Sequence, residues 1–126
     1  MKNSKTDSGP LPISCQTADH YTWGEVCDGW HLVRDADLSV IEESMPPGAA
    51  EVRHYHRKAQ QFFYVLSGQA KMEIDGGIVC LSAGDGVHVL PGIAHQIRNE
   101  SESPVRFLVI SQPPSQRDRV TEPQQS

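Results

Sequence analysis

Cysteine is scarce in this chain and is not arranged for cross-linking. The three cysteines, Cys15, Cys27 and Cys80, are odd in number and widely spaced, and no C-x-x-C pair occurs. A disulfide framework needs paired cysteines, and a thiolate zinc site needs closely spaced ones. We therefore expect free thiols and neither of these two kinds of site.

Positive charge is also in short supply. The chain has 11 Lys and Arg residues against 16 Asp and Glu residues, which gives a net charge of -5, and its basic residues form no cluster. Proteins that bind nucleic acid or anionic membranes use clustered Lys and Arg side chains to neutralise phosphate groups. The sequence therefore predicts neither nucleic acid nor a membrane as a partner.

Long apolar runs are missing as well. No run approaches the roughly 18 residues that a membrane-spanning helix needs. The N-terminal residues, Met-Lys-Asn-Ser-Lys-Thr-Asp, lack the apolar stretch of a secretory signal. On these grounds we expect a cytoplasmic protein.

Long amphipathic helix patterns are absent, and short strand patterns take their place. About nine short apolar or alternating segments, separated by Gly and Pro turns, indicate an all-β sandwich or barrel. The length of 126 residues suits one domain with a single core. Because both ends are polar, we expect a flexible tail over residues 1–14, a β-barrel domain over 15–112 and a flexible tail over 113–126.

Two Asp-Gly dipeptides predict turns. Polar and apolar residues alternate up to Asp75-Gly76, so strands at 70–74 and 78–81 should pair as a hairpin. Asp28-Gly29 carries the same turn chemistry, and we expect a short strand on either side of it.

His54 and His56 are two residues apart in a predicted strand. Alternate side chains of a strand point to the same face, so both imidazoles can reach one point, a spacing typical of metal ligands. The next predicted strand begins at Gln61, and its alternation places Gln61, Phe63 and Val65 on one face. The opposite face, suited to packing or to a dimer contact, carries Phe62, Tyr64 and Leu66.

A third histidine, His95, follows a Pro91-Gly92 turn, and here the sequence resembles the cupin family. Two spaced patterns in one chain are much harder to match by chance than one. Leu90 stands where the family has Pro, but Pro91 still supplies a rigid turn. The first cupin motif is matched at Gly48, His54, His56, Gln61 and Gly68, and the second at Gly84, Leu90, Gly92, His95 and Asn99.

The resemblance implies a double-stranded β-helix, the cupin jelly-roll barrel, and a homodimer. In such a barrel His54, His56, Gln61 and His95 would converge on one divalent transition metal ion. Sequence does not distinguish Fe, Mn, Ni, Co, Cu and Zn, because selection among them depends on geometry and metal supply. The motif glycines are expected at turns with positive φ, and Asn99 should brace a turn through its side chain.

Gln61 stands where the family has Glu. An amide oxygen is neutral and binds a cation more weakly than a carboxylate, so either metal affinity is reduced or Gln61 lies outside the direct ligands. A positively charged site of three histidines would favour an anionic chelating substrate, such as an enolate or a carboxylate.

Other residues leave alternatives open. Gln60 would be the ligand under a shorter motif spacing, although the seven-residue step to Gly68 favours Gln61. His88 lies on the strand before the Pro-Gly turn and suits either a proton shuttle or a surface position. His20 and His31 have no partner at ligand spacing, and we expect both at the surface.

Several functions fit this pattern. The first is a metalloenzyme acting on a small organic substrate, since small cupins include dioxygenases, isomerases and decarboxylases. The alternatives are a non-catalytic binding or sensor cupin, a metal-storage or structural homodimer, and a metal-free sugar-binding barrel. Catalytic residues stay unassigned, because no motif supports an acid or base among Glu42, Glu43, Glu51 and Tyr64.

Overall fold

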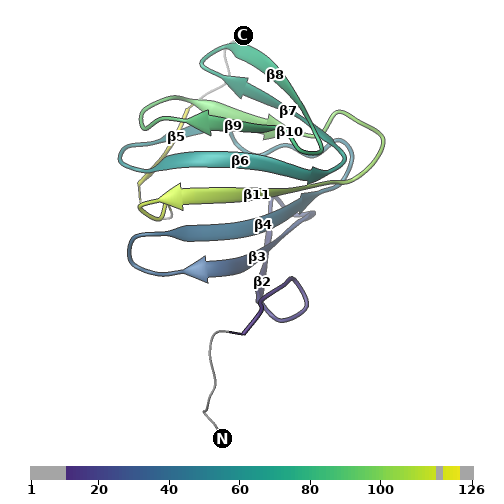
Figure 1. The fold of residues 1–126 in the computed structure, drawn as a ribbon. Helices are drawn as coiled ribbons and strands as arrows, with labels where there is room; N and C mark the ends of the chain where they lie inside the picture. Colours follow the sequence, from purple (N-terminus) through teal and green to yellow (C-terminus); the bar gives the residue numbers. More distant parts are fainter. Residues whose placement is uncertain (1–10, 116–117, 123–126) are drawn as a thin grey trace, which may run out of the picture.

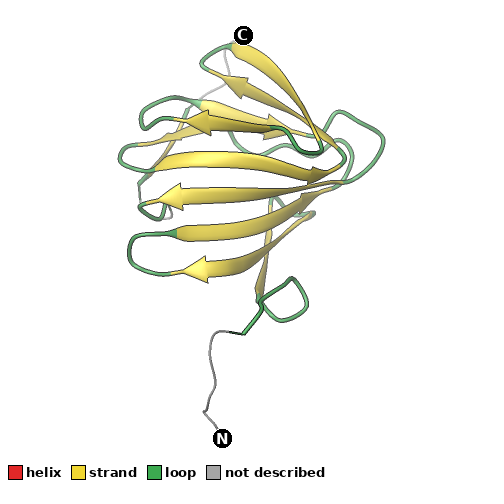
Figure 2. Cartoon of the chain, viewed as in Figure 1, coloured by secondary structure: helices red, strands yellow, loops and turns green. Residues whose placement is uncertain are grey.

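Two antiparallel β-sheets make up the fold, as the ribbon coloured by secondary structure shows (Figure 2). The structure, a computed structural model, describes residues 11–115 and 118–122. No helix in these residues is long and apolar enough to cross a membrane. The strands are β2 (Asp19–Trp23), β3 (Cys27–Arg34), β4 (Ser39–Met45), β5 (His54–His56), β6 (Gln60–Ser67), β7 (Gln69–Ile74), β8 (Gly77–Ser82), β9 (Gly86–Val89), β10 (His95–Arg98), β11 (Val105–Gln112) and β12 (Arg119–Thr121).

The strand order crosses repeatedly between the sheets. One sheet runs β12-β5-β10-β7-β8 and the other β2-β3-β4-β11-β6-β9, so that consecutive strands alternate between sheets after β4, except for the β7–β8 hairpin within one sheet. In Figure 1 the strands β9, β6, β11, β4 and β3 of the second sheet follow one another from top to bottom. The all-β prediction and the predicted jelly-roll arrangement are confirmed.

The core lies between the two sheets and takes side chains from both. Phe63 and Phe107 come from the six-stranded sheet, while Met72 and Ile97 come from the five-stranded one, and all four are buried. Each such side chain contributes about 1.5–3 kcal/mol through burial of apolar surface. This packed interior holds the strands that carry the histidines.

The predicted alternation along β6 is confirmed. Gln61, Phe63 and Val65 are buried, whereas Phe62 and Leu66 are exposed. The cause is the pleat of the strand, which sends successive side chains to opposite faces. Gln61 is thereby turned to the interior of the barrel.

The predicted hairpin at Asp75-Gly76 is also confirmed. Strands β7 and β8 pair antiparallel, with Ile74 opposite Gly77. Asp75 and Gly76 have φ values of 50° and 91°, which is the left-handed region that a tight hairpin turn requires.

The prediction of a turn at Asp28-Gly29 is wrong. Both residues lie within β3, and the turn between β2 and β3 falls earlier, at Gly24 and Glu25, where φ is 57° and 73°. Gly29 serves a different purpose, because a Cβ at this position would overlap the ring of Tyr21 on β2. The glycine therefore marks a close approach of a side chain and not a turn.

The C-terminal segment differs from the predicted tail. Strand β12 pairs antiparallel with β5, and the amide of Glu122 donates to the carbonyl of Arg53 at 2.9 Å. Without β12, one edge of β5 would present unpaired backbone groups. The polar composition of residues 113–126 hid this pairing, and most of the predicted N-terminal tail, residues 1–10, lies outside the described residues.

The turns of the two motifs have the predicted conformations. The amide of Asn99 donates to the carbonyls of Met45 and Ser103 at 3.1 and 2.8 Å, and its oxygen accepts from Ser101. Asn99 therefore braces the turn after β10. Positive φ values occur at Gly48, Gly68, Gly84 and Gly92.

Candidate metal centre

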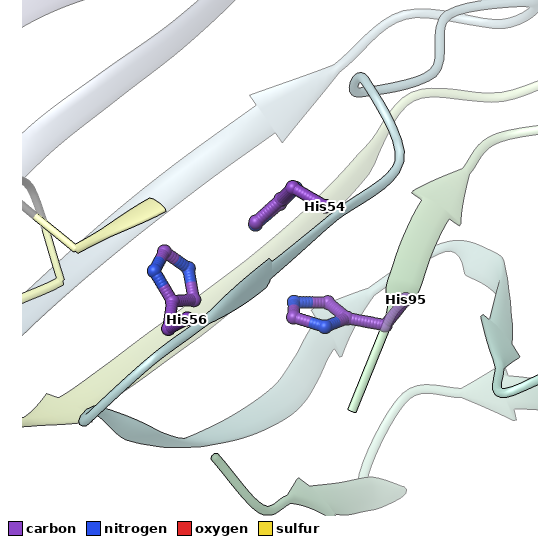
Figure 3. Close-up of side chains that lie close together, drawn as sticks. All are labelled: His54, His56 and His95. Carbon is purple, nitrogen blue, oxygen red and sulfur yellow. The ribbon is translucent and has the colours of Figure 1, made fainter. Parts of the chain in front are cut away.

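Three histidines from two neighbouring strands meet inside the barrel. His54 and His56 lie on β5, and His95 lies on β10 directly opposite His54. Their possible ligand atoms all lie within 4.8 Å of one another, and all three side chains are buried. Figure 3 shows the ring of His95 extending from its strand toward the other two. The sequence pattern predicted this convergence, and the structure contains it.

Each ring is oriented by a hydrogen bond at its Nδ1 atom. His54 Nδ1 lies 2.7 Å from the carbonyl oxygen of Val52, and His95 Nδ1 lies 3.0 Å from that of Ile93. His56 Nδ1 lies 2.9 Å from Oδ1 of Asp118. Because these oxygens only accept, the hydrogen bonds favour a proton on Nδ1 in all three rings and a lone pair on Nε2; in His54 the 2.7 Å contact to Val52 outweighs the 3.3 Å approach of the Arg119 guanidinium to the same atom. Metal-binding histidines are commonly held in this way.

Burial keeps the three imidazoles neutral. Desolvation lowers the pKa of His54 to about 3 and that of His95 to about 4. Desolvation also lowers the pKa of His56, although the neighbouring Asp118 carboxylate opposes this shift. Neutral imidazole is the form that binds metal ions, so the rings are in the ligand-competent state at neutral pH.

Gln61 reaches the histidines with its amide oxygen. Its Nε2 donates to Oγ of Ser111 at 2.9 Å, which turns Oε1 toward His95 Nε2 at 3.1 Å. The Nδ1 proton of His95 is already donated to Ile93, so both atoms of this second contact bear lone pairs. With the proton of His95 on Nδ1, the two lone pairs face a common point that a cation could occupy; with the proton on Nε2, the same contact is a hydrogen bond to Gln61.

The donor set fits a divalent transition metal ion. Two atoms that bind one ion at about 2.1 Å and at a right angle lie about 3.0 Å apart, close to the separation of Gln61 Oε1 and His95 Nε2. Three neutral imidazoles with one amide oxygen suit Fe, Mn, Ni, Co, Cu or Zn better than Ca or Mg. The identity of the ion does not follow from these ligands.

A cavity of about 360 Å³ opens beside the histidines. His95 is almost fully buried and is not part of the cavity wall. Its ring packs edge-on against that of Phe63, and Phe63 does line the cavity. The wall therefore joins the histidine cluster to a space large enough for a small organic molecule. Its lining consists of Tyr21, Trp23, His31, Ile41, Glu43, Glu51, His54, His56, Gln61, Phe63, Val109, Ser115 and Arg119.

Several residues of the cavity wall, and Asp118 behind His56, were not found from the sequence. Asp118 and Arg119 fall in the predicted tail, and Glu43 and Glu51 have no motif. His31 was expected at the surface, but it lines the cavity, and its Nδ1 is buried without a hydrogen-bond partner among the described residues. No local pattern marks these positions, because only the closure of the barrel brings them to the cavity or, for Asp118, to His56.

The remaining candidates lie elsewhere. His88 is exposed, and its Nε2 lies 2.8 Å from the side-chain oxygen of Gln60. Gln60 is exposed at the start of β6 and faces away from the barrel interior, opposite to Gln61. His20 is exposed and pairs with Asp28 at 2.8 Å. The structure therefore brings Gln61, and neither Gln60 nor His88, to the histidine cluster.

Comparisons with known proteins agree with this geometry. The family model described as a cupin domain matches residues 41–111. An uncharacterized protein of Methanocaldococcus jannaschii is 29% identical over 84 residues, which are 67% of this chain and 67% of that protein. Quercetin 2,3-dioxygenase of Bacillus subtilis is 36% identical over 67 residues, 53% of this chain and only 20% of the enzyme.

Solved structures share the same architecture. The structure of KdgF from Halomonas sp. has a TM-score of 0.77 and 20% identity, and the likeness covers 86% of this chain and 97% of KdgF. At that identity the likeness concerns the fold. The matched region spans about a fifth of the dioxygenase, so that enzyme's activity does not transfer to this chain.

Proposed function

Because this chain belongs to the cupin domain family, we propose that it is a small metalloenzyme that acts on an anionic, chelating organic substrate. His54, His56 and His95 would hold a divalent transition metal ion through Nε2, with Gln61 as a neutral fourth ligand. When bound, such an ion polarises a carbonyl or carboxylate oxygen of the substrate. A small-molecule substrate, a homodimer and a cytoplasmic location remain predictions.

The observation that carries this proposal is a cation beside the histidines that donates to the carbonyl of Val52 at 3.5 Å but has no carboxylate within ion-pair distance among the described residues. Arg119 Nη2 lies 3.3 Å from His54 Nδ1, and Arg119 lines the cavity. None of the ion pairs among the described residues includes Arg119, although the chain is acidic overall. A guanidinium binds a carboxylate through two parallel hydrogen bonds. The cavity therefore suits a substrate with a carboxylate at one end.

The neutral ligand set supports the same conclusion. Three imidazoles and an amide add no negative charge to a divalent ion, so the site with its ion keeps a charge of about +2. An anionic substrate with two oxygen donors would reduce that charge and satisfy Arg119. A dioxygenase or an isomerase of a small oxo or hydroxy acid fits this arrangement.

The replacement Arg119→Met tests the anionic substrate. We expect the metal-loaded variant to bind malonate about 10- to 100-fold more weakly, because a charge-assisted hydrogen bond contributes about 1.5–3 kcal/mol. Isothermal titration calorimetry measures the change. Arg34→Met, which alters an exposed residue at the end of β3, should bind malonate as the wild type does. Equal malonate affinity in Arg119→Met and the wild type would remove Arg119 from the substrate site.

The replacement Gln61→Glu tests the fourth ligand. A carboxylate in place of the amide should raise metal affinity about fivefold to tenfold, since an ionic contact replaces a neutral one. Competition against a coloured chelator measures this affinity. The matched control is Gln60→Glu, one residue earlier on the outer face of β6. If both variants bind metal equally, Gln61 is not a ligand.

A test of the whole proposal is elemental analysis of protein purified without a tag, followed by thermal melting with small carboxylates. A ligand that binds the folded protein raises its melting temperature by mass action. We expect one transition metal ion per chain and stabilisation by chelating carboxylates. Substoichiometric metal together with no stabilisation by any carboxylate would show that the proposed function is wrong.

A further inference from the structure

Two carboxyl groups line the cavity and have no role in holding a metal. Glu43 lies on β4, and Glu51 lies in the segment between β4 and β5. Both side chains are part of the wall that also carries His54 and Arg119. Desolvation raises the pKa of Glu43 to about 7, and desolvation together with the nearby Glu43 raises that of Glu51 to about 8.

Each carboxyl group is held at one oxygen. Oε2 of Glu43 accepts a hydrogen bond from the hydroxyl of Tyr21 at 2.6 Å, and Oε1 of Glu51 accepts one from the amide of Ile97 at 3.1 Å. Tyr21 reaches Glu43 only because Gly29 leaves room for its ring. For the described residues, no partner is found for the second oxygen of either group. A bound molecule in the cavity would meet those oxygens.

A buried carboxylate with a structural role looks different in this protein. Glu73 is buried, whereas Glu43 and Glu51 are half-buried at the cavity wall; Arg53 contacts both oxygens of Glu73, at 2.6 and 3.1 Å, and the pKa of Glu73 is lowered. Among the described ion pairs, none involves Glu43 or Glu51. Burying two acids without a counter-ion reduces stability, and such an arrangement is typical of groups that exchange protons with a substrate.

The groups that face this pair come from several elements. Tyr21 on β2 donates to Glu43, His31 on β3 contacts the Tyr21 ring, and Arg119 on β12 favours the ionised form of both acids. His54 on β5 is neutral, for the reason given above. The only cation near the pair is therefore Arg119, as far as the described residues go, and it is not in contact with either acid.

We propose that Glu43 and Glu51 are the acid–base pair of this cavity and that the reaction is proton transfer within an oxo acid. This inference rests on the proposed function, which supplies the site that binds the acid. The ionised carboxylate takes a proton from the carbon next to the substrate carbonyl, and the C–H electron pair forms a C=C bond while the carbonyl electrons move to oxygen. The protonated partner donates a proton to the enolate, so no oxidant or co-reactant is consumed.

Exchange of substrate hydrogen with solvent tests this reaction directly. We expect the metal-loaded protein to catalyse the replacement of the C3 hydrogens of 2-oxobutyrate by deuterium in D₂O. Proton NMR measures this as a loss of the C3 proton signal. Glu51→Gln and Glu43→Gln should each slow this exchange by about 100-fold or more, because a positioned acid or base contributes about 10²- to 10⁴-fold. The matched control, Glu42→Gln, lies on the same strand, pairs with Arg106 away from the cavity and should exchange at the wild-type rate.

A second measurement needs neither metal nor turnover. Folding raises the pKa of both acids above the usual value of 4.5. The folded protein therefore binds more protons than the unfolded chain between about pH 4.5 and 8. The contribution of the two acids to the free energy of unfolding is therefore fully present below about pH 4.5 and is lost as the pH rises to about 8. Thermal melts of metal-free Glu51→Gln should therefore decline less over this range than those of the wild type and of Glu42→Gln.

The possible outcomes separate the two proposals. Suppose that Glu51→Gln and Glu43→Gln bind metal, are stabilised by carboxylates and catalyse exchange as the wild type does. That result would overturn the acid–base pair and leave the proposed function in place. Absence of exchange by a metal-loaded wild type that binds 2-oxobutyrate would overturn it as well. Slowed exchange in both variants, with metal content unchanged, would support it. Failure of the wild type to bind metal would instead count against the proposed function.

Discussion

The replacement His95→Ala is expected to reduce metal content to below about a tenth of that of the wild type. His95 supplies one of three imidazoles, and its Nε2 lies 3.1 Å from Gln61 Oε1, so its loss removes one ligand from the point that Gln61 also faces. Changes to residues that only support a ligand cost about 10- to 100-fold in affinity, and loss of the ligand itself should cost more. Elemental analysis after dialysis and chelator competition measure the effect.

Two controls guard this experiment. The ring of His95 packs against Phe63, so His95→Ala also leaves a cavity, and His95→Gln keeps most of the volume. His88→Ala removes an exposed histidine from the outer face and should leave metal content unchanged. Full metal occupancy in His95→Ala and His95→Gln, with melting temperatures like that of the wild type, would contradict a metal site at this cluster.

The replacement Asp118→Asn is expected to weaken metal binding by about 10- to 100-fold. Oδ1 of Asp118 accepts from His56, and Oδ2 accepts from the amides of Lys58 and Ala59 at 2.8 and 2.9 Å. The carboxylate thus fixes both the tautomer and the orientation of the imidazole and makes it more basic. An amide carries no charge and has only one accepting atom, so it cannot serve all three donors.

Chelator competition measures the effect of Asp118→Asn, with Asp85→Asn as the matched control. Asp85 also accepts from a backbone amide, that of Ser82 at 2.9 Å, but it lies in the turn between β8 and β9. We expect Asp85→Asn to keep the wild-type metal affinity. If both variants bind metal alike, Asp118 supports the local backbone only and has no effect on the ligand.

Much of the fold was predictable because its signals are local. Alternation along β6 and the Asp75-Gly76 turn each involve residues within a few positions of one another. Local signals also failed, in the polar segment that contains β12 and at Asp28-Gly29. The glycine there is required by the Tyr21 ring on another strand, and a dipeptide does not reveal such a contact.

The candidate site divides in a similar way. The grouping of His54, His56 and His95 was predictable, since the two motifs place them at fixed spacing on strands of a known barrel. The contact of Asp118 with His56 was not predictable, because Asp118 is 62 residues from His56 in sequence and lies in a polar segment without any motif. Glu43 and Glu51 were set aside for want of a motif, and only their shared position in the cavity wall distinguishes them from Glu42.

The sequence alone determined which residues alternate and where most turns fall, because backbone geometry acts over a few residues, and its two cupin motifs identified the three imidazoles that meet. The tertiary structure decided what surrounds those imidazoles: the return of β12 beside β5, the carboxylate on His56, the cation at Arg119 and the two acids in the wall. The physical reason is that desolvation and charge proximity depend on which distant segments pack together. These quantities exist only once the barrel has closed.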